Sequence, residues 1–177
     1  METVVLTLLR LGVEDLVHFD FMDPPAPETM MRALEHLNYL GALNDEGEMT
    51  EIGNKIADIP VEPQLAKMLL TAANHNCADE ILSIVSLLST QNIFMRPKEA
   101  AKEADAAKSQ YAHEDGDHIT LLNAYLAYQE SGRSKDYCYD NFLNFRSLQS
   151  ADNIRNQLQR QLRKHGIESR PQNFEAP

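Results

Sequence analysis

The chain has 177 residues, 43% of them hydrophobic, which suffices for the core of one domain or of a small domain joined to a larger one. Its formal net charge of −11 argues against general affinity for a nucleic-acid backbone, because phosphate binding needs clustered basic side chains. Cys77 and Cys138 are too few for a disulfide scaffold, and the sequence shows neither a secretory signal nor an apolar run of the roughly 20 residues that span a bilayer. We therefore expect a soluble, reduced, intracellular protein.

The first part of the chain predicts a helix, a strand and a second helix. An apolar helix is expected over residues 4–11, ended by Gly12, and the β-rich run over 16–21 predicts a strand. Pro27 lies near the first turn of the second helix, where its missing N–H is not needed. Apolar residues then recur at helical spacing, so one face of this helix should pack inward.

A hairpin and a short third helix follow. Gly47 can supply the positive φ of a tight turn between residues 42–44 and 48–50. Thr50 can then cap a helix that stops before Pro60. The order helix, strand, helix, hairpin and helix predicts a winged-helix fold, with the hairpin as its wing.

From Pro63 onward the pattern is almost entirely helical. An amphipathic helix over 65–72 precedes a segment, 81–88, that is apolar nearly all round and should therefore be a central helix. An alanine-rich helix is expected from Pro97 to about Tyr111. Asp117 is the expected N-cap of the next helix, which Ser131-Gly132 would end.

The last helix is expected to begin at Ser150, a good N-cap, and to stop at Gly166. Its apolar positions, Ile154, Leu158 and Leu162, would face the core and leave the arginines outward. Between residues 146 and 170, Asp152 and Glu168 are outnumbered by basic residues, which are Arg146, Arg155, Arg160, Arg163, Lys164 and Arg170. This segment could attract an anion, or it could be a solvated face whose arginines pair with acidic neighbours.

Three other features have plainer structural explanations. Residues 113–118 combine two histidines with three carboxylates, but a turn followed by a helix accounts for them better than a metal site does. The aromatic residues of 137–145 could stack on bases, although a core role is favoured. The two cysteines lie in or beside apolar helical segments without a neighbouring base, which favours packing over catalysis. The chain contains no glycine-rich loop followed by Lys-Ser or Lys-Thr, so a P-loop nucleotide site is excluded.

A series of short motifs runs through most of the chain in a fixed order. They are LVHFDFMDPP (16–25), LGALN (40–44), TEIG (50–53), PQLAKML (63–69), ILSIVSLLS (81–89), FMRP (94–97) and GDHITLLN (116–123). In sequence and order they resemble the helicase-associated region of DEAH-box RNA helicases. Residues 24–29, 138–142 and 146–153 are most similar to the branch of that family that acts in spliceosome disassembly and ribosome assembly and is stimulated by G-patch proteins.

The resemblance implies a mainly α fold with a small β wing. A winged-helix domain is expected over 1–61, a ratchet-like helical bundle over 62–166 and a flexible tail over 167–177. In these helicases two RecA-like ATPase domains precede this region and an OB-fold domain follows it, while the ratchet-like domain forms one wall of the channel for single-stranded RNA. The chain alone would then be no enzyme and would need no cofactor, whereas its parent would use ATP and Mg²⁺ to move 3′ to 5′ along RNA. The expected location is the nucleoplasm and nucleolus, with no membrane contact.

Two sets of contact residues follow from this hypothesis. RNA is expected at the start of the last helix, where free N–H groups and the positive helix end attract phosphate, and the residues are Arg146, Ser150, Asn153 and Arg155. A G-patch protein would lay an amphipathic helix on the winged-helix domain, against Met31, Leu34, Leu37, Tyr39 and Leu40. The alternatives are a peptide-binding scaffold and a winged-helix DNA-binding regulator, although the recognition helix over 28–43 offers a single strong donor, Arg32.

Overall fold

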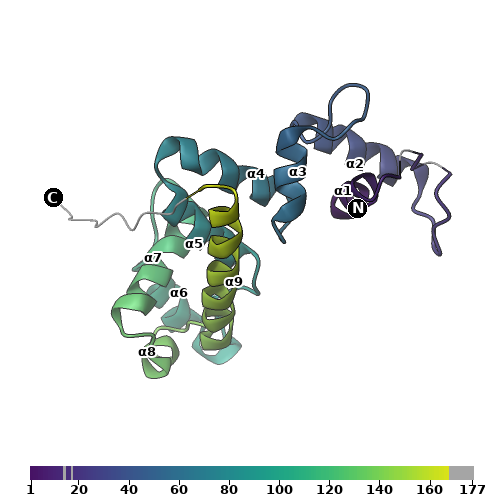
Figure 1. Ribbon diagram of the computed structural model, residues 1–177. Coiled ribbons are helices and arrows are strands. Elements are labelled where there is room, and N and C mark those ends of the chain that lie inside the picture. The colour runs from purple at the N-terminus through teal and green to yellow at the C-terminus, as the bar shows by residue number, and fades with distance from the viewer. Residues whose placement is uncertain (14, 17, 168–177) are drawn as a thin grey trace. The chain divides into compact units, whose positions relative to one another are not determined.

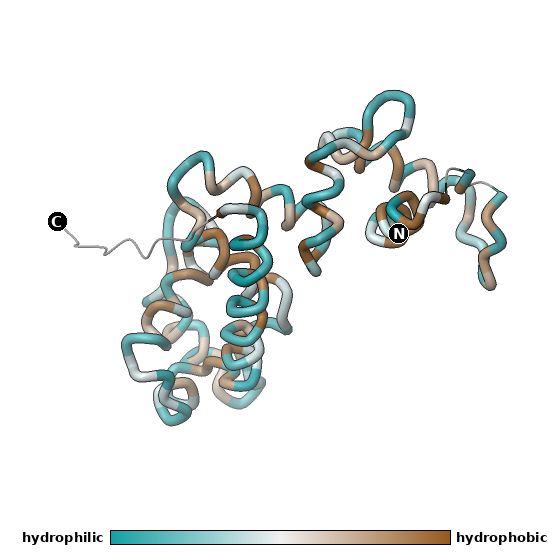
Figure 2. The backbone as a smooth tube through the Cα atoms, viewed as in Figure 1, coloured by the Kyte–Doolittle hydropathy of each residue, from teal (hydrophilic) through white to brown (hydrophobic). Residues whose placement is uncertain are grey.

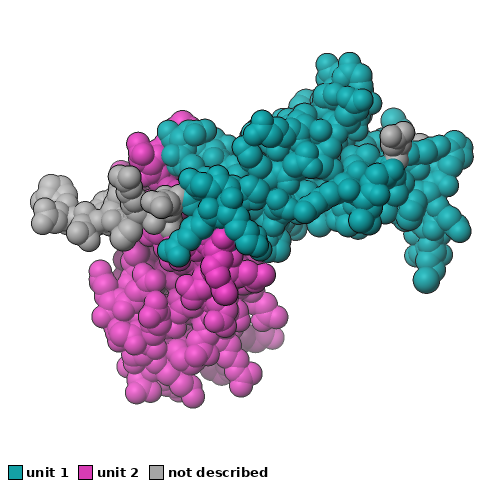
Figure 3. Space-filling model, viewed as in Figure 1, with its two compact units in different colours: residues 1–74, 161–167 teal, residues 75–160, 168–177 magenta. Residues whose placement is uncertain are grey.

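The computed structural model describes residues 1–13, 15–16 and 18–167, and these are mostly helical (Figure 1). They divide into two compact units, drawn in different colours in Figure 3. The first unit comprises Met1–Asn74 together with Gln161–Ile167, and the second comprises His75–Arg160. A mainly α fold with very little strand confirms the predicted fold class. The expected flexible tail lies outside the described residues, apart from Ile167.

The first unit is built from four helices around a small apolar core. They are α1 (Glu2–Arg10), α2 (Pro27–Tyr39), α3 (Glu51–Asp58) and α4 (Pro63–Ala72). Helix α1 contacts α2 and α3, and α4 packs on α3. The interior is closed by side chains that recur at helical spacing, chiefly Val5, Leu6, Met30, Leu37 and Ile56. These are the inward faces that the apolar periodicity predicted.

The predicted hairpin is present in a reduced form between α2 and α3. Its pairing is one antiparallel bridge, Leu43 with Met49, and Gly47 takes the left-handed φ of 81° that the turn requires. Thr50 caps α3 as predicted, because its hydroxyl oxygen accepts a hydrogen bond from the N–H of Gly53 at 3.0 Å. At Gly53 a Cβ atom would lie 2.1 Å from the carbonyl oxygen of Ala42, so only glycine lets α3 approach the hairpin this closely.

The predicted strand over 16–21 is wrong. Its described residues form bends and irregular backbone, with no bridge to another segment. Aromatic and β-branched residues make a strand only where a second strand accepts their backbone hydrogen bonds. Elsewhere in the described residues, the one further bridge joins Phe94 to Leu143 in the second unit.

The second unit is a helical bundle with an aromatic core. Its helices are α5 (Ala78–Leu88), α6 (Ala101–Ser109), α7 (Asp117–Glu130), α8 (Lys135–Asp140) and α9 (Phe145–Lys164, whose last residues belong to the first unit), with short 3₁₀ turns at Ala73–His75 and Lys98–Ala100. Helix α5 is central as predicted, because every side chain from Leu82 to Leu87 is buried. Its two buried serines, Ser83 and Ser86, donate to carbonyl groups one turn back, which satisfies their hydroxyls. In contrast to α5, most of α9 is hydrophilic (Figure 2).

Helix ends in this unit differ from the sequence-based prediction at α6, α7 and α9. Helix α6 is shorter than the helix predicted from Pro97 to about Tyr111, because a 3₁₀ turn occupies Lys98–Ala100 before it. Asp117 is the first residue of α7 rather than its cap, and Gly116 occupies the N-cap position with a φ of 116°. Helix α9 begins at Phe145 rather than at Ser150. The predicted end of α9 is confirmed, since Gly166 takes a left-handed φ of 73° just after it. No described helix combines the length and the apolar character needed to cross a membrane.

Candidate functional site

The start of α9 is fixed by Asn144. The side-chain oxygen of Asn144 accepts a hydrogen bond from the N–H of Ser147 at 3.2 Å, and its carbonyl accepts one from the N–H of Leu148 at 3.1 Å. Asparagine is among the best N-cap residues, so this arrangement is locally sufficient to begin a helix. Ser150 therefore lies in the second turn, where its N–H is used inside the helix. The expectation that Ser150 offers a free N–H to a phosphate is wrong.

Arg155 lies on the buried side of α9. It stands at heptad spacing from Leu148 and Leu162, both fully buried, so the helix carries its side chain inward. Its Nε donates to the hydroxyl oxygen of Ser83 at 3.0 Å, and its Nη2 pairs with the carboxylate of Asp79. The side chain is 17% exposed. The expectation that all arginines of this helix face outward is therefore wrong for Arg155.

The other three predicted RNA-binding residues share one exposed face of α9. Arg146, Ser150 and Asn153 are all exposed, and Gln149, which the sequence-based prediction missed, stands among them. Their spacing of i, i+3, i+4 and i+7 is that of a single helical stripe. Gln149 stands four residues before Asn153. A predicted helix start at Phe145 would therefore have placed both on the same face.

A polar groove runs along one side of this stripe. It has a volume of about 520 Å³, and its lining residues are Ser89, Thr90, Gln91, Asn144, Arg146, Ser147, Ser150 and Ile154. The hydroxyls of Ser89 and Thr90 donate to carbonyl groups at the end of α5, each at 2.8 Å, so their oxygen lone pairs remain available as acceptors. We call this the hydroxyl groove. Arg146 is the basic side chain among its lining residues.

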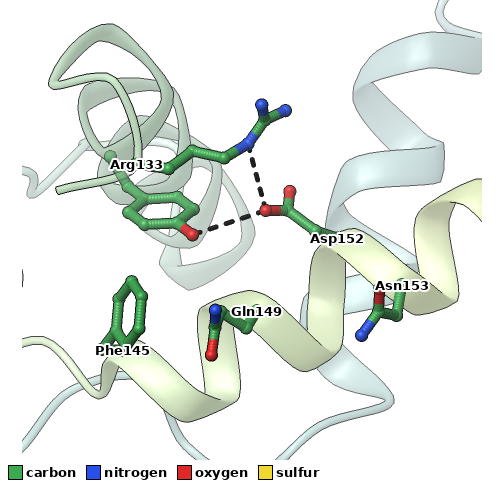
Figure 4. Close-up of a pocket in the computed structure, with 6 residues that line it drawn as sticks. Arg133, Phe145, Gln149, Asp152 and Asn153 are labelled. Atoms are coloured by element: carbon green, nitrogen blue, oxygen red, sulfur yellow. Dashed lines mark hydrogen bonds and ion pairs between the residues drawn. The ribbon is translucent and has the colours of Figure 1, made fainter. Parts of the chain in front are cut away.

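A smaller hollow of about 280 Å³ lies on the other side of the stripe (Figure 4). We call it the aromatic-amide hollow, and its lining residues are Tyr128, Arg133, Phe145, Gln149, Asp152 and Asn153. The ring of Phe145 meets that of Tyr128 nearly edge-on, with centroids 6.4 Å apart and planes at 71°. This side of α9 therefore presents a half-buried aromatic ring next to two exposed amides.

Asp152 organises the polar groups at the edge of this hollow. Its carboxylate accepts hydrogen bonds from the hydroxyls of Tyr125 at 2.6 Å and Tyr128 at 3.4 Å, and pairs with Nε of Arg133 at 3.1 Å. Burial raises the pKa of Tyr128 to about 12 and, with the hydrogen bond to Asp152 added, raises the pKa of Tyr125 as well. Both phenols donate a hydrogen bond to Asp152. Arg133 adopts a left-handed φ of 60°, a conformation that no local sequence signal predicted.

The predicted partner-binding residues of α2 and its C-terminal end separate into exposed and buried positions. Met31 and Tyr39 are 60% and 86% exposed, and Leu34 and Leu40 are half-buried. Leu37 is fully buried in the core of the first unit, so its inclusion in a contact surface is wrong. Helical geometry explains the division, because Leu37 is in phase with Met30 and Ala33 on the inward face.

Residues 113–118 form a turn leading into α7. The ring of His113 accepts a hydrogen bond from the N–H of Asp115 at 3.2 Å, and the backbone N–H of His113 donates to the hydroxyl of Thr120 at 3.1 Å. Within the part of the chain that the structure describes, no three His, Cys, Asp or Glu side chains come together as metal ligands would.

The chain matches two domains that accompany helicases. The helicase-associated domain (HA2), winged-helix, matches residues 33–61, and the helicase-associated domain (HA2), ratchet-like, matches residues 62–121. Together the two matches cover half of the chain. The chain belongs to the HA2 family, the helicase-associated region of DEAH-box helicases. Because the matches end before α8 and α9 begin, the site on α9 rests on its geometry.

Proposed function

We propose that this chain is the non-catalytic C-terminal module of an ATP-dependent 3′–5′ DEAH-box RNA helicase and that α9 lines its RNA channel. The observation that carries the proposal is the exposed stripe of Arg146, Gln149, Ser150 and Asn153, which lies between two polar hollows. Hydroxyl and amide side chains together with an arginine are the groups that contact the sugars and phosphates of RNA. Arg155 is left out of this proposal, because Asp79 and Ser83 engage its guanidinium.

The local charge of α9 supports RNA contact in an acidic protein. The helix carries five basic side chains against one acidic residue, Asp152, whereas the whole chain has a net charge of −11. Asp152 is itself paired with Arg133, so it does not cancel the charge of Arg146. Among the described residues Arg146 has no ion-pair partner. An isolated module with so few free cations should bind RNA weakly and with modest salt dependence.

The chain itself is proposed to be without ATPase activity. It contains no glycine-rich phosphate loop followed by Lys-Ser or Lys-Thr, so binding and hydrolysis of ATP with Mg²⁺ are assigned to RecA-like domains of the parent helicase. The same parent would carry an OB-fold domain.

The winged-helix unit is proposed to dock the amphipathic helix of a G-patch protein. Met31 in the second turn of α2 and Tyr39 at its last position are large, exposed side chains. Leu34, between them, and Leu40, just after them, are half-buried. Such a spacing suits a helix-in-groove contact. From the resemblance of residues 24–29, 138–142 and 146–153, we propose that the parent acts in pre-mRNA splicing, spliceosome disassembly and ribosome biogenesis in the nucleoplasm and nucleolus.

The test is RNA binding by the purified chain, measured by fluorescence anisotropy at low salt with a labelled single strand of about 12 nucleotides. Arg146→Glu should weaken binding several-fold and should lower the slope of log affinity against log salt concentration by at least about 1. Arg32→Glu makes the same charge change on the exposed face of α2 and should leave RNA binding unchanged.

Two outcomes would count against this function. Equal RNA affinity of wild type and Arg146→Glu would show that α9 does not contact RNA. Tight binding of duplex DNA that Arg32→Glu abolishes would instead support a winged-helix DNA-binding regulator, since Arg32 is the strong donor of α2.

A further inference from the structure

The aromatic-amide hollow has a regular arrangement along α9. Phe145, Gln149 and Asn153 follow one another at i, i+4 and i+8, so that one aromatic ring and two amides lie in a row on successive turns. Figure 4 shows these three side chains along the helix, with Asp152 on the same helix reaching toward Arg133. A planar apolar surface beside two hydrogen-bonding groups is the requirement for binding a flat heterocycle.

The two amides are free to bind a ligand. Gln149 and Asn153 are exposed, and neither side chain makes a hydrogen bond to another described residue. Each amide offers a carbonyl acceptor and two N–H donors. Asparagine and glutamine amides can therefore pair with the donor and acceptor atoms on the edge of any base, and they match adenine especially well.

Arg133 adds a cation whose position is fixed. Its Nε is held by Asp152 at 3.1 Å, and Asp152 is fixed in turn by the hydroxyls of Tyr125 and Tyr128. The side chain of Arg133 is 59% exposed, and its terminal nitrogens have no partner among the described residues. Those nitrogens point away from Asp152 (Figure 4). They are available to an anion at the rim of the hollow.

We propose that the aromatic-amide hollow binds one unpaired base of single-stranded RNA. The base stacks on Phe145, its edge is hydrogen-bonded by the amides of Gln149 and Asn153, and Arg133 contacts the neighbouring phosphate. The volume of about 280 Å³ lies just below the roughly 300–1,000 Å³ of small-molecule sites, so it suits one base better than a nucleotide cofactor. This inference rests on the proposed RNA-channel function, since it specifies how the same stripe of α9 holds its ligand.

The experiment separates base contacts from phosphate contacts by using two labelled strands of equal length. One is oligoadenylate of about 12 nucleotides, and the other has the same backbone with abasic positions throughout its centre. The wild-type chain should bind oligoadenylate at least about fivefold more tightly than the abasic strand, because stacking of a base on an aromatic ring adds to affinity. Arg146→Glu should lower the affinity for both strands by the same factor, since it removes a phosphate contact that both strands make.

Two double variants on α9 test whether the amides of Gln149 and Asn153 bind the base. The double variant Gln149→Ala/Asn153→Ala should lower oligoadenylate affinity about fivefold while leaving the abasic strand unaffected. Asn156→Ala/Gln157→Ala removes a matched pair of exposed amides outside both hollows and should change neither affinity. Phe145→Leu should also reduce the preference for oligoadenylate. Because all four amides are exposed, these double variants should fold normally, even if Phe145→Leu loosens the packing on Tyr128.

The results distinguish failure of the base site from failure of the proposed function. If both strands bind equally well and the Gln149→Ala/Asn153→Ala variant behaves like wild type, the base site is overturned. If Arg146→Glu still weakens binding in that case, the RNA-channel function stands. If Arg146→Glu is without effect as well, both proposals fail.

Discussion

The two units of this molecule use their large apolar side chains in opposite ways. Among the described residues, the first unit leaves many of them exposed, namely Met1, Val4, Leu11, Phe19, Met22, Met31 and Tyr39. The larger second unit exposes fewer, which are Leu88, Met95, Leu126 and Tyr139. Its remaining aromatic residues close a core in which Tyr125 and Tyr128 are almost fully buried.

This difference indicates two kinds of contact surface. Exposed apolar groups suit a protein partner, whose own apolar residues would cover them. A well-packed core instead makes a rigid support, on which α9 can hold polar side chains in fixed positions for a hydrophilic ligand. The hydroxyls in the second core are satisfied, for example those of Tyr111 and Tyr137, which lie 2.8 Å apart. Its stability should therefore depend on a few interior residues and little on its surface.

The largest effect is expected from the core of the second unit. Leu148→Ala removes a fully buried side chain from the aromatic cluster and should reduce the free energy of unfolding by about 2–5 kcal/mol. Tyr139→Ala, at an 80% exposed position of α8, should change it by about 0.5 kcal/mol or less. Urea denaturation followed by circular dichroism measures both. If both variants lost a similar amount of unfolding free energy, this unit would lack the tightly packed core described above.

Alkaline pH should weaken the second unit through its buried tyrosines. Burial raises the pKa of Tyr128 from 10.0 to about 12. Because the folded state holds this proton more tightly than the unfolded state, the stabilisation is complete below pH 10 and is lost as the pH rises towards 12. That loss amounts to roughly 2–3 kcal/mol at most.

A Tyr128→Phe variant separates this effect from general alkaline denaturation. The variant cannot titrate at this position, so its melting temperature should fall less between pH 9 and pH 11.5 than that of the wild type. Tyr39→Phe, at an exposed position of the first unit, is the matched control and should follow the wild type. If the melting temperatures of all three proteins decreased by the same amount, Tyr128 would not limit stability at high pH.

Features set by neighbouring residues could be predicted from the sequence. The cap at Thr50, the turn at Gly47 and the buried segment of α5 each depend on contacts within a few positions or on a strong apolar pattern. The stripe that joins Arg146, Ser150 and Asn153 follows from the helical repeat alone, but only once the helix is known to begin at Phe145, because the predicted start at Ser150 leaves Arg146 outside it.

Features set by distant residues could not be predicted in this way. The run over 16–21 has strand-forming side chains but no partner among the described residues. Arg155 is turned inward by Asp79 and Ser83, which lie on α5. The polar edge of the aromatic-amide hollow depends on Arg133, which reaches Asp152 from the turn between α7 and α8. Each of these required the tertiary contacts to be known.

The next largest effect is expected at the pair of Arg155 and Asp79. Arg155→Met keeps the apolar stem but leaves Asp79 without its partner, so the free energy of unfolding should fall by about 1–3 kcal/mol. RNA affinity should remain close to that of the wild type. Arg160→Met is the control, because Arg160 is exposed and, among the described residues, bonds only to the carbonyl of Asn156 on its own helix. If Arg155→Met instead lost much RNA affinity while its stability stayed unchanged, Arg155 would contact RNA rather than support the fold.

The smallest effect distinguishes the observed start of α9 from the predicted one. Asn144→Ala removes the acceptor for the N–H of Ser147 and should reduce the free energy of unfolding by about 1 kcal/mol. Ser150→Ala should be neutral or slightly stabilising, because Ser150 is exposed in the second turn and alanine has the higher helix propensity. Urea denaturation of the two variants under identical conditions gives the comparison. If Ser150→Ala were instead the more damaging change, the helix would begin at Ser150, and its free N–H groups would again be available to a phosphate at that end.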